Sequence, residues 1–380
     1  FKEGEAVRRR SSQGLGERLA PYVLLAPFLF TLIVFFGYAF VRVFYFSFTD
    51  YDLFATPKWV GLKNYLNIFR DIDFTLAMKH SLTFMLVVTT AQTVLALVLA
   101  LVLNQRIRGI NFFRAAYYMP SVTSSVVITL IFIWFFQRRG VMNFLISKFQ
   151  EYRGIVGLFL LLAAALQLSL VGWEKLRRRP VSLFEPSFLF LSLLLSFIVV
   201  FSAVRFGLLT PREVAPVDII WFNTTKKWPN FLGSLAFPVP LGAIMLFNIW
   251  TTAPTFMLLY LAGLQDIPRE LYEAAAVDGA ERWHMIRYIV IPQLKPITFL
   301  VVTMGLIGTL QMFDQVAILG GQAPRQSTIT LAYYIYSNIF PSSATPRVGM
   351  ASAAAMFLAI LTSVIVYIQR KVLGEEGDHA

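Results

Sequence analysis

Apolar residues occur along this chain in eight blocks of about twenty, separated by segments that hold most of the polar and charged residues. A helix of about 20 apolar residues is long enough to cross the hydrocarbon core of a membrane. We therefore predict an all-α polytopic membrane protein with eight spans. These are Pro21–Ser47, Ser81–Leu103, Ala115–Phe136, Ile155–Trp173, Ser187–Leu209, Phe237–Leu264, Ile297–Ile318 and Gly349–Ile368.

The composition agrees with lipid as the solvent for most of the chain. Hydrophobic residues make up 57% of the 380 and charged residues 14%, whereas a soluble domain has about 25% charged residues. The first apolar block is too long for the core of a signal peptide, so we expect it to remain as a membrane anchor. Cysteine is absent and the three histidines lie far apart. The sequence therefore predicts no disulfide, no metal site and no catalytic residue.

Basic residues in the connections indicate an orientation, because Lys and Arg are retained on the cytoplasmic side more often than they are translocated. The basic N-terminus, the run Arg177–Arg179 and the basic C-terminus agree on both termini being cytoplasmic. The segment Gln137–Gly154, with four basic residues, does not follow this bias. The net charge of +12 is spread over loops, so nucleic-acid binding is not indicated.

One connection, Gln265–Pro296, is long, charged and rich in helix formers. Asp266 is expected to cap a helix with Pro268 in its first turn, and Gly279 is expected to end that helix. A second amphipathic stretch, Glu281–Ile291, follows it. The pattern predicts a rigid two-helix projection facing the cytoplasm, and a solvated loop is the alternative.

This connection resembles the "EAA" signature of the permease subunits of ABC importers, written E-A-A-x3-G-x9-I-x-L-P. Glu273-Ala274-Ala275, Gly279 and Ile289 to Pro292 match it, with Ile291 in place of the usual leucine. Further segments resemble the maltose and glycerol-phosphate branch of that family. They are Gly109–Pro120, the G-x-x-N turn Gly140–Asn143, Leu264–Pro268, and Gly320-Gly321 followed by Pro324.

The resemblance implies a division of labour between subunits in a bacterial or archaeal cytoplasmic (inner) membrane. In such importers two homologous permeases form the pathway, two ATPase subunits lie beneath them, and an extracytoplasmic solute-binding protein delivers the substrate. ATP and Mg²⁺ belong to the ATPases, and this chain is expected to bind no cofactor, since it lacks the Gly-Lys of a phosphate loop. The residues implied in ATPase coupling are Tyr272, Glu273, Ala274, Ala275, Asp278 and Gly279.

The same resemblance implies a six-helix core, the type I importer permease fold, with an added hairpin of two spans. An even number of added crossings leaves the orientation of everything downstream unchanged. The predicted parts are a basic N-terminus at 1–20, three core spans at 21–146, the inserted hairpin at 147–217, three core spans at 218–371 with the coupling loop at 265–296, and a tail at 372–380.

Polar residues within two late spans are the candidates for contact with a solute. The first set recurs at helical spacing on one face of the sixth span: Asn248, Thr251, Thr252 and Thr255. The second set occurs in the seventh span: Thr309, Gln311, Met312 and Phe313. Uncharged donors and acceptors suit sugar hydroxyls, and matching positions contact sugars in similar permeases. Polar contact between helices is the alternative for each residue. For Gln92 we predict an interhelical hydrogen bond.

These features favour the permease subunit of an ATP-driven importer of a sugar, a di- or oligosaccharide of the maltose or trehalose type. Glycerol-phosphate or another small polar solute is the alternative within the same class. A stand-alone secondary transporter would need buried charged groups for ion coupling, and Asp314 is the only carboxylate well inside a predicted span. A membrane enzyme would need a cluster of catalytic groups, which the sequence does not contain.

Overall fold

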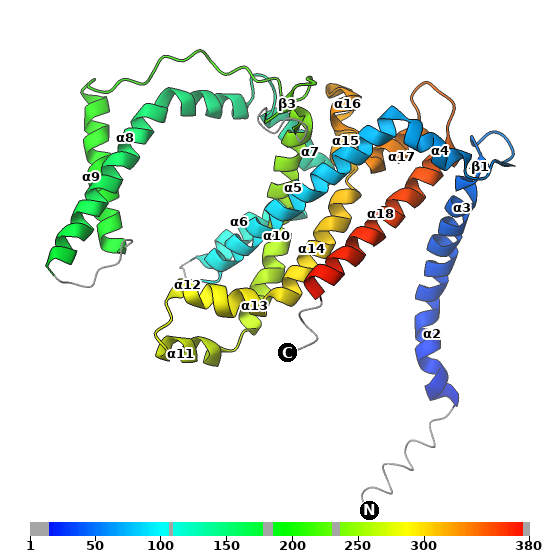
Figure 1. Ribbon diagram of the computed structural model, residues 1–380, viewed down its shortest axis with the longest axis horizontal. Helices are drawn as coiled ribbons and strands as arrows, with labels where there is room; N and C mark the ends of the chain where they lie inside the picture. Colours follow the sequence, from blue (N-terminus) through cyan, green and yellow to red (C-terminus); the bar gives the residue numbers. More distant parts are fainter. Residues whose placement is uncertain (1–14, 106–108, 178–184, 230–235, 375–380) are drawn as a thin grey trace, which may run out of the picture. The chain divides into compact units, whose positions relative to one another are not determined.

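The computed structural model describes residues 15–105, 109–177, 185–229 and 236–374 (Figure 1). Most of the predicted basic N-terminus and of the predicted tail lie outside these ranges, as do Arg178 and Arg179. Two compact units are present, one formed by 129–224 and the other by the rest of the chain. Each unit is described by itself.

Helices account for nearly all of the regular structure, as predicted. Within the described residues, seven are long and apolar enough to cross a membrane. They are Pro21–Ser47, made of α2 (Leu15–Thr31), the π-helical η1 (Leu32–Gly37) and α3 (Tyr38–Ser47); α5 (Ile72–Leu103); α8 (Val141–Leu176); α9 (Pro186–Arg205); α10 (Val239–Asp266); Lys295–Gln322, made of α14 (Lys295–Leu310), α15 (Asp314–Leu319) and η4 (Gly320–Gln322); and α18 (Val348–Gly374).

The predicted third span, Ala115–Phe136, is not one straight helix. It is divided into α6 (Ile110–Val122) and α7 (Ser125–Phe135) by a bend, and the total reaches eight spans if this pair crosses together. Pro120 lies near the end of α6 and has no backbone N–H, so one hydrogen bond of the helix cannot form there. Thr123 is extended, and its hydroxyl donates to the carbonyl oxygen of Met119 at 2.9 Å. The sequence carries a local signal for this break, because Ser121, Thr123, Ser124 and Ser125 follow Pro120, but the prediction of one span passed over it.

A short segment joins the first span to the bundle. Strands β1 (Thr49–Asp50) and β2 (Lys58–Trp59) pair antiparallel, with Thr49 opposite Trp59, and α4 (Lys63–Arg70) follows. The buried Asn64 amide donates to the carbonyl oxygens of Ser47 and Thr49 at 3.0 and 2.8 Å. A β-carbon at Gly349 would lie 2.0 Å from the Thr49 oxygen. Only glycine therefore lets the start of α18 pack against this strand.

Helices α5, α10 and α14 form the core of the larger unit (Figure 1). Ala96 and Ala100 on α5 are fully buried, and their small size lets α10 approach through Phe256, Met257 and Tyr260. The Tyr260 hydroxyl contacts that of Thr298 on α14 at 3.1 Å. A second buried cluster joins α4, α5, α14 and α18 to α17 (Leu331–Ile339), which follows the short α16 (Arg325–Thr328).

The smaller unit is built on the paired helices α8 and α9. The Ser192 hydroxyl on α9 donates to Gln167 Oε1 on α8 at 3.1 Å, in a buried setting. Gly140 precedes α8, and a β-carbon there would lie 2.6 Å from the carbonyl oxygen of Phe135. Glycine is thus required at the first position of the G-x-x-N turn. The insertion boundaries of 147 and 217 stay a prediction.

The larger unit also contains a second two-stranded sheet and the predicted cytoplasmic connection. In the sheet, β3 (Lys227–Trp228) pairs antiparallel with β4 (Phe237–Pro238) just before α10. The connection holds α11 (Arg269–Val277), α12 (Arg282–Met285), the π-helical η3 (Ile286–Val290) and α13 (Ile291–Gln293). The predicted two-helix projection is therefore present as a helical segment that leads directly into α14.

Candidate functional site

The first candidate site is α11, which follows α10 after a break of two residues. Asp266 does not cap this helix as expected, because its backbone is still part of α10, and Pro268 takes the cap position instead. Ile267 and Pro268 are extended, which turns the chain away from the direction of α10. Ile267 itself is buried in the core of the larger unit, so the turn is held in place.

The end of α11 matches the sequence prediction. Gly279 has φ of +76° and lies in open space, so its role is conformational rather than steric. The backbone N–H groups of Gly279 and Ala280 donate to the carbonyls of Ala276 and Ala275 at 3.1 and 2.9 Å. These bonds close the last turn in the manner of a glycine C-terminal motif. The helix is consequently short, with fixed ends.

The side chains of α11 divide into an anchored side and an exposed side. Tyr272 packs against the core of the larger unit, and burial raises the pKa of its phenol. Glu273, Ala274 and Asp278 are exposed, and Ala275 is half-buried. Val277 is 88% exposed, which is unusual for an apolar residue on a charged segment. This arrangement exposes a small, partly apolar surface on a helix with fixed ends.

The segment after α11 returns the chain to the bundle. Val290 at the end of η3 and Leu294 before α14 are both buried in the core. Pro296 lies in the first turn of α14, where a missing N–H costs little. Pro292 lies just after the π-helical η3 within one unbroken helical run. Pro296 thus stands at the start of α14. Both sides of the projection are therefore attached to the same core.

The second candidate site is the polar stripe on α10, whose four side chains are all half-buried. The Thr251 hydroxyl bonds to the carbonyl oxygens of Phe247 and Asn248 on its own helix, at 3.1 and 3.2 Å. Among the described residues, the side chains of Asn248, Thr252 and Thr255 have no hydrogen-bond partner. Three polar groups on a membrane helix are thus available to a ligand or to another subunit.

The four candidates at the end of α14 do not share one environment. Thr309 is buried and its hydroxyl contacts that of Thr89 on α5 at 3.2 Å, besides bonding to its own helix. Met312 is buried, and its carbonyl oxygen accepts a bond from Thr330 at 2.9 Å. Gln311 is exposed and lines an open groove with residues of α18. No hydrogen bond or ring contact among the described residues joins these positions to the stripe on α10.

Phe313 is half-buried in a group of aromatic rings. Its ring centroid lies 5.0 Å from that of Tyr336, in an edge-on arrangement, and 6.3 Å from that of Tyr333. Next to it, Asp314 begins α15 and accepts a hydrogen bond from the Ser125 hydroxyl at 3.1 Å. The Asp314 carboxylate is exposed rather than enclosed in the bundle. An exposed, hydrogen-bonded carboxylate does not have the setting expected for ion coupling.

Gln92 lies where α5 crosses α14, and its environment differs from the expectation. The side chain is 1% exposed, yet its carbonyl oxygen has no hydrogen-bond partner among the described residues. A β-carbon at Gly305 would lie 2.7 Å from the Gln92 amide nitrogen and 3.0 Å from Thr89. The predicted interhelical hydrogen bond is therefore absent for this oxygen, and packing against glycine replaces it.

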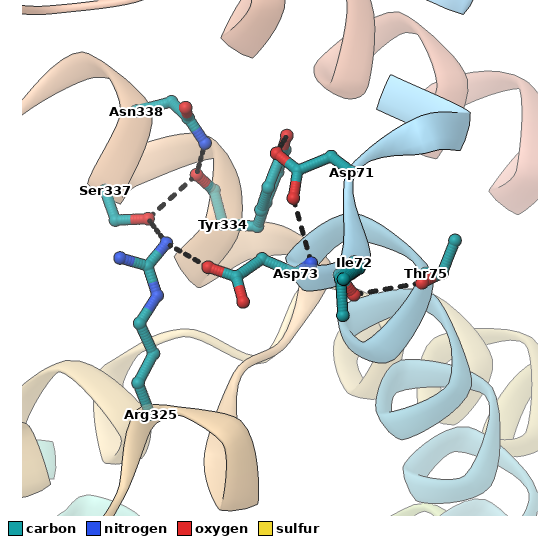
Figure 2. Close-up of polar contacts among 8 residues, drawn as sticks. All are labelled: Asp71, Ile72, Asp73, Thr75, Arg325, Tyr334, Ser337 and Asn338. Atoms are coloured by element: carbon teal, nitrogen blue, oxygen red, sulfur yellow. Dashed lines mark hydrogen bonds and ion pairs between the residues drawn. The ribbon is translucent and has the colours of Figure 1, made fainter. Parts of the chain in front are cut away.

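A polar network at the start of α5 was not predicted from the sequence (Figure 2). Asp71 caps α5 by accepting from the backbone N–H of Asp73, and its other oxygen accepts from the Tyr334 hydroxyl at 2.8 Å. Arg325 pairs with Asp73 at 3.3 Å and donates to Ser337 at 3.1 Å. The network joins α5, α16 and α17, whose residues are far apart in the chain.

The sequence profile of one family matches residues 92–374, from the middle of α5 to the end of α18. Its description is the inner-membrane component of binding-protein-dependent transport systems. This chain belongs to that family. It is a multi-pass inner-membrane protein, as the apolar helices require.

Similar proteins agree along nearly the whole chain. A probable ABC transporter permease of Pyrococcus horikoshii is 27% identical and covers 94% of this chain and 97% of its own length. The trehalose/maltose transport system permease of Thermococcus litoralis is 25% identical, with 92% of each chain covered. A solved structure of a bacterial alginate ABC transporter, bound to a periplasmic protein carrying an alginate pentasaccharide, superposes with a TM-score of 0.64. It is 18% identical over 94% of this chain and 96% of that chain, so it supports the fold. The chain is thus a transport component.

Proposed function

We propose that this chain is the translocation subunit of an ATP-driven ABC importer that takes up a sugar. The observation that carries the proposal is the exposed helix α11, fixed at one end by Ile267 and Pro268 and at the other by the left-handed Gly279. A short helix that is rigidly attached at both ends does not bend when a partner pushes on it. A displacement of the partner is therefore passed on to the bundle. The resemblance to the "EAA" signature identifies the expected partner as an ATPase subunit.

The proposed complex contains a second, homologous permease, two ATPase subunits that bind ATP and Mg²⁺, and an extracytoplasmic binding protein. Both termini and α11 face the cytoplasm in this arrangement. ATP-driven closure of the ATPases moves α11, and α10 and α14 move with it because both ends of the connection are attached to their core. The pathway then opens alternately to either side of the membrane.

The proposed solute is a neutral sugar, with a di- or oligosaccharide favoured by the relatives. Asn248, Thr252 and Thr255 supply an amide and two hydroxyls with no partner among the described residues. Such groups match sugar hydroxyls without introducing charge. Thr309 and Met312 support the pathway by holding α14 in place, whereas Gln311 and Phe313 are accessible to a solute.

Purification of the tagged chain from its native membrane tests the assembly. An ATPase and a different permease are expected to accompany it, and uptake in liposomes is expected to require ATP and the binding protein. Uptake by the chain alone, driven by an ion gradient, would contradict the proposal. Trypsin added to sealed vesicles tests the orientation, since cleavage near Arg269 or Arg287 is expected only when the cytoplasmic face is accessible.

A further inference from the structure

The turn before α8 and the first turns of that helix carry a concentration of basic side chains. Arg138, Arg139, Lys148 and Arg153 fall within one short segment of the smaller unit. This segment is the one that departs from the charge bias expected for an extracytoplasmic connection. The retention of Lys and Arg on the cytoplasmic side does not explain basic residues at such a position. We therefore look for a specific role.

A buried asparagine organises the backbone around these residues. Asn143 is 3% exposed and donates to the carbonyl oxygens of Arg138 and Ile219, at 2.8 and 2.9 Å. Its own oxygen accepts from the indole N–H of Trp221 at 2.8 Å. The amide group of this side chain thus bonds to two segments of the unit, the turn before α8 and the segment that holds Ile219 and Trp221. The start of α8 is therefore held firmly against the segment that follows α9.

These contacts form the walls of an open pocket of about 600 Å³. The Ser147 hydroxyl accepts from the backbone N–H of Val217 at 2.8 Å and closes one side. Basic, acidic and apolar side chains line the rest, including Arg139, Lys148 and Phe144. The pocket lies wholly within the smaller unit. It is large enough for a polar headgroup rather than a single ion.

The charges in the pocket are only partly balanced. Arg138 pairs with Asp218 and lowers the pKa of its carboxyl group, and Lys148 pairs with Glu151 at 2.7 Å. Arg139 forms no hydrogen bond or ion pair with any residue that the structure describes. Both ion pairs are solvent-exposed and are consequently weak. An incoming anion thus meets the Arg139 guanidinium, which lies in the field of Asp218 without bonding to it, and an ammonium group that can change partners.

The same part of α8 has the features of a helix at a membrane surface. Phe144, Phe149 and Tyr152 are exposed next to Lys148 and Arg153. Exposed aromatic and basic side chains on one short helical segment are typical of the boundary between lipid and water. Figure 1 shows α8 bending, so that its first part runs in a different direction from the remainder, which pairs with α9. The helix as a whole is long and apolar enough to cross a membrane.

We propose that this pocket binds the phosphate of an anionic phospholipid, with Arg139 and Lys148 as its main ligands. The acyl chains lie along the exposed Phe144 and Phe149, which continue the apolar surface of the hairpin. Such a site gives the added hairpin a function, since it ties the smaller unit to the lipid surface at a defined depth. The site does not depend on which solute is transported.

Exchange of lipids on the assembled transporter tests the site. The complex is incubated with vesicles of phosphatidylcholine that either contain or lack phosphatidylglycerol, and the retained lipid is measured by native mass spectrometry. Retention of phosphatidylglycerol over phosphatidylcholine is expected. Arg139→Gln is expected to weaken it about fivefold at low salt, as for one basic residue at a membrane surface. Lys58→Gln removes an exposed charge from the larger unit and serves as the control, with no expected effect.

Four outcomes would contradict the proposal. Equal retention of the two lipids, or no effect of Arg139→Gln, would exclude a headgroup site here. Displacement of the lipid by inorganic phosphate, but not by chloride of equal ionic strength, would indicate a site for a soluble anion. Weaker association of the binding protein in Arg139→Gln, with lipid retention unchanged, would indicate a protein-docking surface. Each result is independent of the sugar proposal, because ATP-driven uptake can be measured in phosphatidylcholine alone.

Discussion

The Tyr334 hydroxyl donates to the Asp71 carboxylate at 2.8 Å, although the two residues are 263 positions apart in the chain (Figure 2). Tyr334 is 1% exposed, and its ring packs edge-on against that of Phe74. One side chain therefore connects α17 to the cap of α5 by both a hydrogen bond and aromatic contact. Its neighbour pair, Arg325 and Asp73, connects α16 to the same turn.

Tyr334→Phe is expected to lower the free energy of unfolding by about 2 kcal/mol, because a buried bond to a charged acceptor is lost. Burial and the bond to Asp71 raise the pKa of Tyr334. The neutral phenol is thus favoured in the folded state. The stability that it contributes is complete below the ordinary tyrosine pKa of about 10 and is lost as the pH rises from there through the higher pKa of the folded state. Thermal unfolding in detergent across this range measures both effects. An equal alkaline decline in Tyr334→Phe would show that another group is responsible.

The sequence predicted the elements with local signals better than the contacts between them. Helix α11 is found where the alanine run, Pro268 and Gly279 indicate it, because these residues act on their own backbone. The break between α6 and α7 and the pair Tyr334–Asp71 were not predicted. Pro120 and the serine and threonine residues after it lie at the break, but the mean hydropathy of the block hides them. The pair depends on packing between distant segments. The contact between Thr309 and Thr89 was not predicted for the same reason, since it depends on how α14 packs against α5.

Gly279→Ala tests whether the end of α11 controls coupling. A left-handed backbone costs a residue with a β-carbon about 1–2 kcal/mol, so the last turn is expected to reshape while the bundle stays folded. Uptake should fall several-fold, and ATP hydrolysis by the complex should lose its dependence on the binding protein. The matched control is Gly308→Ala, because a β-carbon at Gly308 meets nothing within 4 Å and its φ is not positive. Full uptake in Gly279→Ala would count against a coupling role.

Asn248→Ala combined with Thr252→Ala tests the polar stripe. Both side chains lack partners among the described residues. Their removal is therefore expected to leave folding unchanged while raising the KM for uptake or altering the choice of sugar. Thr251→Ala is the control on the same helix, because the Thr251 hydroxyl is already bonded to its own backbone. Poor assembly with the second permease, and an unaltered substrate profile once assembled, would assign the stripe to helix contact instead.

Asn143→Ala tests how the smaller unit is closed. The change removes three hydrogen bonds and leaves the Trp221 indole N–H and two carbonyl oxygens without that partner. We expect the unit to lose about 2 kcal/mol or more of stability, and trypsin to cleave faster at Arg212 in the segment after α9. Asn223→Ala, at an exposed asparagine of the same unit, should have no effect. Unchanged cleavage in Asn143→Ala would mean that other contacts hold the segment.

Gln92→Met tests the cost of the unpartnered oxygen at the crossing of α5 and α14. Methionine has a similar unbranched shape but no carbonyl group to leave unbonded, so the described conformation is expected to gain about 1 kcal/mol. The opposite change, Gly305→Ala, places a β-carbon against the Gln92 amide and should destabilise the same crossing. Thermal unfolding of both variants measures these shifts, with opposite signs expected. If Gln92→Met is the less stable protein, the amide has a partner in the membrane, such as a water molecule or the second permease. If it is more stable yet transports more slowly, the unbonded amide keeps this conformation from becoming too favourable for alternating access.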